Sequence, residues 1–486
     1  MTDFVLNPIE SFISFPVPGS QQRIDTPNYE WLDMWEYWRL PYSLWGGTKR
    51  MRKAGKYYLP QEPGETDQSY EARVQKTFLY NAYRRSIQSL AGQPFIKPVT
   101  VHNLPTELEY LLDDADSMGN SLTEVAHNLL IDGLHYGKYH VLVDYPSVDG
   151  NITLRDQREL NIAPYFNTVS PLNLIGWESE RVGGMNALLN IRIKEYSIEP
   201  VDEYQELLVT RVRVYKPDEV EVHAIYGRES GDFDVEGVSD NTLGRVPLIT
   251  GYVEKTGFMS SRPPLEDLAW LNLRHWQSSS EQNVILHATR VPIFFASGFE
   301  EGELENTTIG PYRGISTTND SANIRYIEHE GNAITAGERD LEKIEKQMEK
   351  MGSDILQQKG VSRQTATARQ IDKSESLSVM QLAVRELEHS LEKAIQIAGD
   401  WINVDASDVK VTIGEDLSIN QAANPVDDLE KIGLSDEAML KELKRRGVVS
   451  ESVGVDDINT KSNEVPQNLT DEFNEGEEED EEQNQE

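Results

Sequence analysis

The sequence contains no cysteine, which excludes disulfide bonds, thiolate metal sites and a cysteine nucleophile. It has no run of about 18 apolar residues, so no membrane span is expected. Its acidic and mixed first residues are unlike a signal peptide. Basic residues are scarce, because 46 Lys and Arg stand against 83 Asp and Glu, a net charge of −37. This balance argues against a protein that coats nucleic acid or binds an anionic membrane through broad basic faces.

The acidic charge is uneven along the 486 residues, a length that suggests two to four structural units. Residues 456–486 hold 13 acidic residues and one basic residue, Lys461, and therefore carry −12 of the total charge. Such a segment repels itself and has too little apolar surface to offset its ordering entropy. We predict a disordered acidic tail, which either keeps the protein soluble or acts as a nucleic-acid mimic or a dock for a basic partner.

Tryptophans mark the first helix, which follows an extended N-terminal arm over residues 1–30. Trp31, Trp35 and Trp38 have the spacing i, i+4, i+7, which places them on one stripe of a helix. This stripe is expected to lie in the core or in a subunit interface. A basic cluster follows in a predicted loop, and we expect it to be solvated or salt-bridged rather than a phosphate site. The cluster consists of Lys49, Arg50, Arg52, Lys53 and Lys56.

The next region reads as helix, with Asp67 as a possible N-cap of a helix over 67–91. Its expected apolar face carries Val74, Phe78 and Ala82.

A mixed α and β domain is predicted for roughly the first 260 residues. A helix over 121–136 leads into YHVLVDYP (139–146), whose β-branched residues and terminal proline are typical of a buried strand. Short turns separate the later strands, as in an antiparallel sheet. These strands are expected at about 186–198, 204–215, 219–228 and 246–254.

A helical hairpin with a small β insertion is predicted next. Pro263 and Pro264 open a helix that runs to about Arg290, and its middle, QSSSEQN, is polar on every face. This pattern fits a helix that meets water or neighbouring polar helices. The strands VPIFFASG and NIRYIEH follow, and a second helix over about 335–358 carries an apolar seam with 3,4 spacing. The seam residues are Leu341, Ile344, Met348, Met351 and Ile355.

The last predicted elements are a glycine-containing break at residues 359–365, a third long helix over about 366–402, a strand at 409–414 and a short helix near 435–446.

Catalytic motifs are not convincing. The segment Gly133–Tyr139 imitates a phosphate loop but has three residues between its glycines and tyrosine after lysine, where the motif needs four residues and Ser or Thr. His127, His135 and His140 match no zinc spacing and are expected to be structural. No spacing distinguishes the carboxylates as a magnesium site. The candidates considered are Asp144, Glu178 and Glu180. We therefore expect no metal, no cofactor and no enzymatic activity.

The order of several segments resembles the portal proteins of tailed double-stranded-DNA bacteriophages, and in particular a portal-like phage family. The resemblance covers about residues 30–415 and rests on sequence texture, with no catalytic signature involved. The segments that carry it are residues 55–98, LLIDGLHYGKYHVLVDYP (129–146), PYFNTVSPLNLIGWE (164–178), RPPLEDLAWLNLRHWQSSSEQN (262–283) and residues 365–401.

The resemblance implies an α+β portal-type fold that forms a ring, typically a dodecamer. Its parts would be an arm and α+β wing (1–262), stem helices (263–290 and 334–358) around a β clip (291–333), a tunnel loop (359–366), a long wing or crown helix with a return strand (367–419), a short helical crown (420–455) and the acidic tail.

The resemblance also implies a conduit for DNA packaging and ejection at one capsid vertex. Its partners would be copies of itself, double-stranded DNA, terminase, an adaptor or neck protein and the major capsid protein, in a virion assembled in the bacterial cytoplasm. The candidate DNA contacts are Lys343, Lys346, Lys350, Lys359 and Arg363. For the lysines, the alternative is an ordinary salt bridge within the helix, such as Glu342 with Lys346. The tunnel-loop candidates are Gly360, Val361, Ser362, Arg363, Gln364 and Thr365, and the clip candidates are Ile293, Phe294, Phe295 and Tyr326.

Two other functions remain open. One is a different head–tail connector or adaptor ring of a phage, and the other is a metal-dependent nucleic-acid enzyme.

The net acidity of the chain fits a DNA conduit, because a basic lining would release counterions and hold DNA tightly.

Overall fold

The computed structural model describes residues 23–146, 162–227, 232–290, 293–299, 319, 321–327, 332–354 and 379–414. All of them belong to one unit that ends at Gly414. The predicted tunnel loop with Lys359, the short crown and the acidic tail lie outside the described residues.

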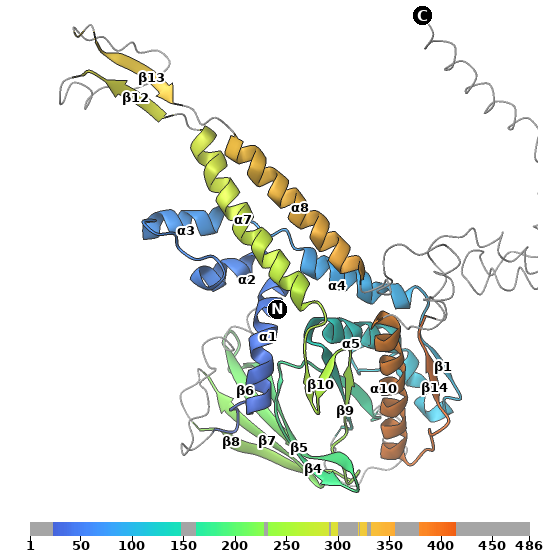
Figure 1. Cartoon of the computed structure of the whole chain (residues 1–486). Helices are drawn as coiled ribbons and strands as arrows, with labels where there is room; N and C mark the ends of the chain where they lie inside the picture. Colours follow the sequence, from blue (N-terminus) through green and yellow to red (C-terminus); the bar gives the residue numbers. More distant parts are fainter. Residues whose placement is uncertain are drawn as a thin grey trace, which may run out of the picture. The chain divides into compact units, whose positions relative to one another are not determined.

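The larger sheet has five antiparallel strands in the order β4-β5-β6-β7-β8 (Figure 1). Three of them confirm the antiparallel strands expected from the sequence, while β4 and β8 were not predicted. The strands are β4 (Leu174–Val182), β5 (Met185–Pro200), β6 (Glu206–Tyr215), β7 (Glu219–Tyr226) and β8 (Asp234–Asp240).

A smaller sheet, in the order β3-β2-β9, holds the strand predicted at 139–146. Its strands are β2 (Lys138–Asp144), β3 (Tyr165–Val169) and β9 (Leu248–Tyr252). Helix α5 (Leu122–Tyr136) leads into β2 and begins at a capping box in which Ser121 and Glu124 satisfy each other's backbone N–H groups. It ends at Gly137, whose φ of 83° is the left-handed conformation that favours glycine. These local signals explain why the sequence predicts this passage correctly.

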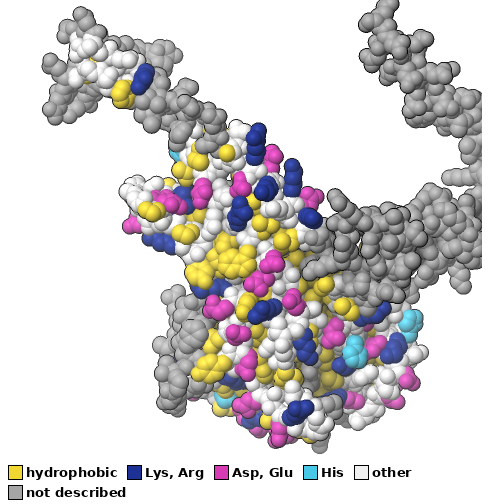
Figure 2. Space-filling model, in the orientation of Figure 1, with side chains coloured by type: hydrophobic (Ala, Val, Ile, Leu, Met, Phe, Trp, Pro, Cys, Tyr) yellow, Lys and Arg dark blue, Asp and Glu magenta, His cyan; other side chains and the backbone are white. Residues whose placement is uncertain are grey.

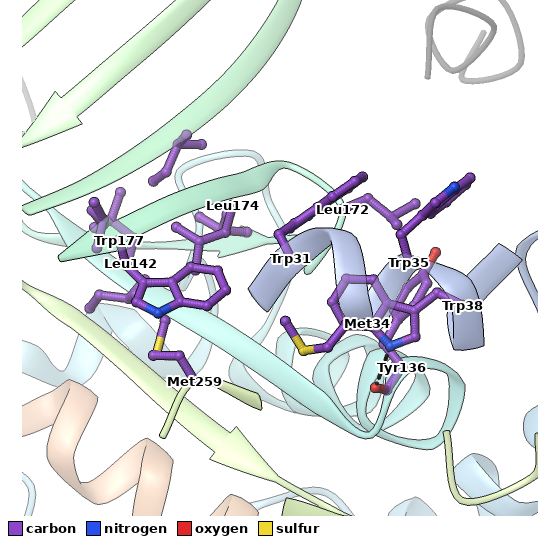
Figure 3. Close-up of a cluster of buried hydrophobic side chains, with 14 of the residues drawn as sticks. Trp31, Met34, Trp35, Trp38, Tyr136, Leu142, Leu172, Leu174, Trp177 and Met259 are labelled. Carbon is purple, nitrogen blue, oxygen red and sulfur yellow. Dashed lines mark hydrogen bonds between the residues drawn. The ribbon is translucent and has the colours of Figure 1, made fainter. Parts of the chain in front are cut away.

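The main core forms around α1 (Tyr29–Trp45), as the tryptophan stripe predicted (Figure 3). Trp31 and Trp35 stack with ring centroids 5.7 Å apart, and Trp31 meets Trp38 edge to face. The Trp38 indole N–H donates to the Tyr136 carbonyl at 3.0 Å. The aromatic helix therefore fills the space between α5 and the two sheets.

A buried lysine lies in this core where the phosphate-loop imitation would place a phosphate ligand. The Lys138 ammonium donates to the Met259 carbonyl at 2.7 Å and lies over the rings of Trp38 and Trp177. Burial lowers the pKa of Lys138 to about 7, while the two indole faces favour its charge. A Cβ on Gly137 would lie 1.9 Å from the Arg262 carbonyl oxygen. Lys138 and Gly137 thus hold the segment that leads into the following long helix, and neither is open to a nucleotide.

The prediction of a single helix over 67–91 is wrong. The chain forms α3 (Asp67–Lys76) and α4 (Ala82–Gly92), separated by five non-helical residues, and Thr66 instead of Asp67 caps α3. Phe78 lies in the break and is 67% exposed, so it is not part of a buried face. The break exists because its residues contact a distant helix, described below, which local periodicity does not reveal.

The basic cluster is helical and not a loop, because α2 spans Gly47–Ala54. The Arg50 guanidinium lies 3.9 Å from the Tyr42 ring centroid, and Arg52 donates twice to the Thr77 carbonyl at 3.0–3.1 Å. Arg50 and Arg52 therefore contact their own chain.

The late helix and return strand complete the same body. Helix α10 (Val379–Ile402) packs against β9, α5 and β2, while β14 (Lys410–Thr412) pairs with β1 (Thr100–His102). The β14 strand is held further by two α10 carboxylates, since Glu392 accepts from the Val411 N–H and Glu388 from the Ile413 N–H. The predicted helix and strand are confirmed over these residues, and the α+β body extends beyond residue 260 to include them.

Candidate functional site

The candidate functional site is the helical hairpin, which the sequence predicts as an element separate from the α+β body. Helix α7 (Glu266–Arg290, 25 residues) and helix α8 (Asn332–Asp354, 23 residues) lie side by side (Figure 1). At 1.5 Å per residue each is about 35 Å long. Strands β12 (Ile293–Ser297) and β13 (Asn323–Ile327) are inserted between them in the chain and pair antiparallel. The order helix, β insertion, helix is thus confirmed.

The predicted apolar seam holds the hairpin together. Ile344 and Met348 are 0% and 1% exposed, whereas Leu341 and Met351 are half-buried and Ile355 lies outside the described residues.

Two pairs of charged or titratable side chains join α7 to α8 beside the seam. Arg274 pairs with Asp340 at 3.2 Å, and the His275 Nε2 atom lies 3.1 Å from Glu345. These contacts fix the rotation of α8 about its own axis, and therefore decide which of its faces are exposed.

The polar middle of α7 meets water at Glu281 and Asn283, and its buried side chains contact other segments of the same chain, including helix α8. The expectation that it meets water or neighbouring helices is therefore confirmed. Ser280 is 0% exposed and accepts a hydrogen bond from Thr77 at 3.0 Å. Gln277 donates to the Tyr58 carbonyl, and Gln282 donates to the Ile334 carbonyl, both at 3.0 Å. The partners lie far away in sequence, so the QSSSEQN pattern alone could not reveal them.

An alanine at position 280 tests the buried contact of α7 with Thr77. Ser280→Ala removes the acceptor for Thr77 in a buried site, and we expect the free energy of unfolding to fall by about 1–3 kcal/mol. Ser279→Ala, at a half-buried neighbour, is the control and should cost no more than about 0.5 kcal/mol. Urea unfolding followed by circular dichroism measures both. Equal losses would contradict the assignment of a specific buried bond to Ser280.

Two further anchors hold the hairpin on the body, and sequence reasoning missed both. Buried Asn272 accepts from the Tyr83 N–H at 3.0 Å and donates to the Tyr80 carbonyl at 2.8 Å, which pins the break between α3 and α4. On α8, Gly352 allows close approach to α4, since a Cβ there would lie 2.5 Å from the Ser86 hydroxyl. The end of the hairpin that holds the start of α7 and the end of α8 thus packs on the body.

Three of the predicted DNA-contact residues are described, and all three lie on exposed positions of α8: Lys343, Lys346 and Lys350. Figure 2 shows dark-blue basic side chains over this helix. Among the described residues, no ion pair joins Glu342 to Lys346. Lys359 and Arg363 lie outside the described part of the chain.

The predicted clip residues lie on the β12–β13 ribbon. Phe294 is opposite Tyr326 in the backbone register, and Phe295 is opposite Arg325. Phe295 is 39% exposed and its ring lies 5.2 Å from the Arg325 guanidinium. The side chains of Ile293, Phe294 and Tyr326 lie outside the described part of the structure.

The candidate metal-binding carboxylates are not brought together. Asp144 accepts hydrogen bonds from the hydroxyls of Tyr165 and Tyr215, and Glu178 accepts one from Asn190. Glu180 is exposed on β4. Among the described residues, no three His, Asp or Glu side chains form a group that could hold a metal ion.

The structural role expected for the histidines is confirmed for two of them. His135 contacts the Tyr83 hydroxyl at 3.0 Å, and His140 contacts the Thr250 hydroxyl at 2.9 Å. Burial lowers the pKa of His135 to about 3 and the pKa of His140 well below its usual value, so both rings are neutral near pH 7.

A family model described as a domain of unknown function (DUF4055) matches residues 264–402, from the start of α7 to the end of α10. The match covers less than a third of the chain. No curated protein matches the sequence. Within the described residues, no helix is both long and apolar enough to cross a membrane.

Solved structures show a distant likeness. One is a chain from the "Neck of native GTA particle computed with C12 symmetry", which is 11% identical, with 72% of this chain and 85% of that chain covered and a TM-score of 0.40. Another comes from the "Virion of native gene transfer agent (GTA) particle", which is also 11% identical, with 83% and 95% covered and a TM-score of 0.35. With TM-scores below 0.5, this likeness by itself assigns neither a fold family nor a function to the chain.

Proposed function

We propose that the chain is a structural subunit of a phage head–tail connector, and specifically a portal-type subunit that forms a ring around double-stranded DNA. The observation that carries the proposal is the α7–α8 hairpin, which is anchored on an α+β body and has a β ribbon inserted between its helices. The ordered sequence resemblance to portal proteins supports the same assignment. In this role the protein is not an enzyme, and it acts by assembly and by guiding DNA.

A ring fits the surfaces that the single chain leaves unfinished. A two-stranded ribbon is marginal in water on its own, and within the described residues β12 and β13 pair only with each other. Strand pairing between neighbouring copies would cover their edges. Head-to-tail interfaces of this kind repeat until the ring closes.

The proposed partners follow from the ring. The β ribbon, with Phe295 exposed, is the dock for terminase during packaging and then for the adaptor or neck protein, while the α+β body meets the major capsid protein. Contact of α8 lysines with DNA, the tunnel loop at Gly360–Thr365 and a dodecameric subunit number remain predictions from the sequence.

A different phage adaptor ring is the second candidate. Such adaptors are smaller and dominated by helices, whereas this chain combines a hairpin about 35 Å long with a five-stranded and a three-stranded sheet. These features favour the portal-type assignment.

Particle mass in solution tests the assembly. Mass photometry of the purified full-length protein should show one dominant species whose mass is a large whole-number multiple of the chain mass. A protein that stays monomeric in every buffer would contradict the proposal.

A further inference from the structure

Helix α8 carries three separate stripes of side chains. Its four basic residues and four of its acidic residues each follow the spacing i, i+4, i+7, i+11, and the acidic set begins one residue earlier. The basic stripe consists of Arg339, Lys343, Lys346 and Lys350, and the acidic stripe consists of Glu338, Glu342, Glu345 and Glu349. The third stripe is the apolar seam.

The apolar seam is the stripe that is buried in the hairpin. At about 100° per residue, the basic stripe is centred about 150° and the acidic stripe about 110° around the helix from the seam. All four basic residues are exposed, and so are three of the four acidic residues. The fourth, Glu345, is half-buried and pairs with His275 of α7. The two charged stripes therefore form adjoining, largely exposed faces of α8.

The charge of α8 does not favour DNA as the partner of the basic stripe. Between Asn332 and Asp354 there are six acidic and four basic residues, so the helix carries −2. A phosphate backbone beside the basic stripe would also lie about 100° around the helix from a parallel row of carboxylates. Carboxylates in that row oppose the electrostatic attraction that drives phosphate binding.

A second copy of this chain fits both stripes at once. Equal spacing lets the cations of one α8 lie opposite the carboxylates of a parallel neighbour after a shift of about one residue, or 1.5 Å. A ring needs two different, complementary surfaces on each subunit. We propose that, in the ring described above, the basic stripe of each α8 binds the acidic stripe of the next copy. The inference rests on the proposed ring and assigns Lys343 and Lys346 to an intersubunit contact rather than to DNA.

Charge reversal of each stripe tests the inference. The basic-reversed variant is Arg339→Glu, Lys343→Glu and Lys346→Glu, and the acidic-reversed variant is Glu338→Lys, Glu342→Lys and Glu349→Lys. In each threefold variant the two stripes carry charge of the same sign. We therefore expect electron microscopy to show rings for the unmodified protein and none for either threefold variant. The sixfold variant that combines both sets keeps the net charge and restores complementarity, so its rings should return. Mixing the two threefold variants should also restore rings.

Salt gives an independent readout. Raising the salt from about 0.1 M to about 1 M shortens the Debye length from about 10 Å to about 3 Å. Exposed stripes are screened under these conditions, so the ring fraction of the unmodified protein should fall. A ring fraction that does not change would contradict the inference.

The outcomes separate the inference from the proposed function. Circular dichroism should show that all variants fold, since the exchanged residues are exposed. Rings that persist in both threefold variants, or that do not return in the sixfold variant, would overturn the stripe pairing. Intact rings of the basic-reversed variant that no longer retain DNA would assign the basic stripe to DNA and also overturn it. Absence of rings from the unmodified protein would instead overturn the proposed function.

Discussion

Replacing Arg73 with methionine is expected to lower the free energy of unfolding by about 1–3 kcal/mol, because it leaves the part-buried Glu65 carboxylate without its cation. The two side chains are 7% and 10% exposed, and the Arg73 guanidinium binds the carboxylate at 2.8–2.9 Å. Arg73 also donates to the Pro60 carbonyl at 2.8 Å and to Ser280 of α7 at 3.4 Å. The loss would therefore loosen the attachment of α3 to the hairpin.

A double variant and a pH series sharpen this test. Arg73→Met with Glu65→Leu removes both charges and should be less destabilised than Arg73→Met alone. Hydrogen bonds from Arg73 hold the pKa of Glu65 below 4.5, so the pair stabilises the fold above that pH and less so as the pH falls through the lowered value. The deficit of Arg73→Met should shrink in acid. The pair is not coupled if the double variant loses at least as much free energy of unfolding as Arg73→Met alone, and if the loss in Arg73→Met does not change with pH.

Replacing Trp38 with alanine is expected to cost about 3–5 kcal/mol. Trp38 is 0% exposed, donates to the Tyr136 carbonyl and lies 5.3 Å from the Lys138 ammonium. The change opens a cavity, removes one of the two side-chain hydrogen bonds to the Tyr136 carbonyl, which Ser261 also contacts, and removes one ring from the lysine. With a total stability of about 5–15 kcal/mol, a substantial part would be lost. Urea unfolding at pH 7 measures the effect.

Trp270 offers a matched control on the same chain. It is 56% exposed on α7, so Trp270→Ala should change the free energy of unfolding by no more than about 0.5 kcal/mol. Trp38→Phe keeps most of the buried ring and should lose less than Trp38→Ala. If Trp38→Ala and Trp270→Ala lost the same amount, the core around α1 would not be the main source of stability.

The parts of the fold that sequence predicts are those with local causes. The tryptophan stripe of α1 and the passage from α5 into β2 each involve residues within a few positions of one another, and both are confirmed. The seam of α8 is correct for the same reason, since Ile344 and Met348 are both buried.

The missed features depend on contacts between distant segments. Asn272 and Tyr83 are 189 positions apart, and Thr77 and Ser280 are 203 positions apart, so neither the break between α3 and α4 nor the buried polar side of α7 has a local signal. The sequence assigns no role to Lys138 once the phosphate-loop motif is rejected, and its position beside Trp38 and Trp177 depends on distant contacts. The charged stripes of α8 can be counted in the sequence, but their exposure follows only once α7 is seen to cover the seam.

A cryo-electron microscopy map of the purified full-length protein tests the central claim most directly. We expect a closed, rotationally symmetric ring in which α7–α8 hairpins surround a central hole. The basic stripe of each α8 should lie beside the acidic stripe of the next copy. A map of monomers, or of a closed two-fold dimer without a hole, would contradict the account.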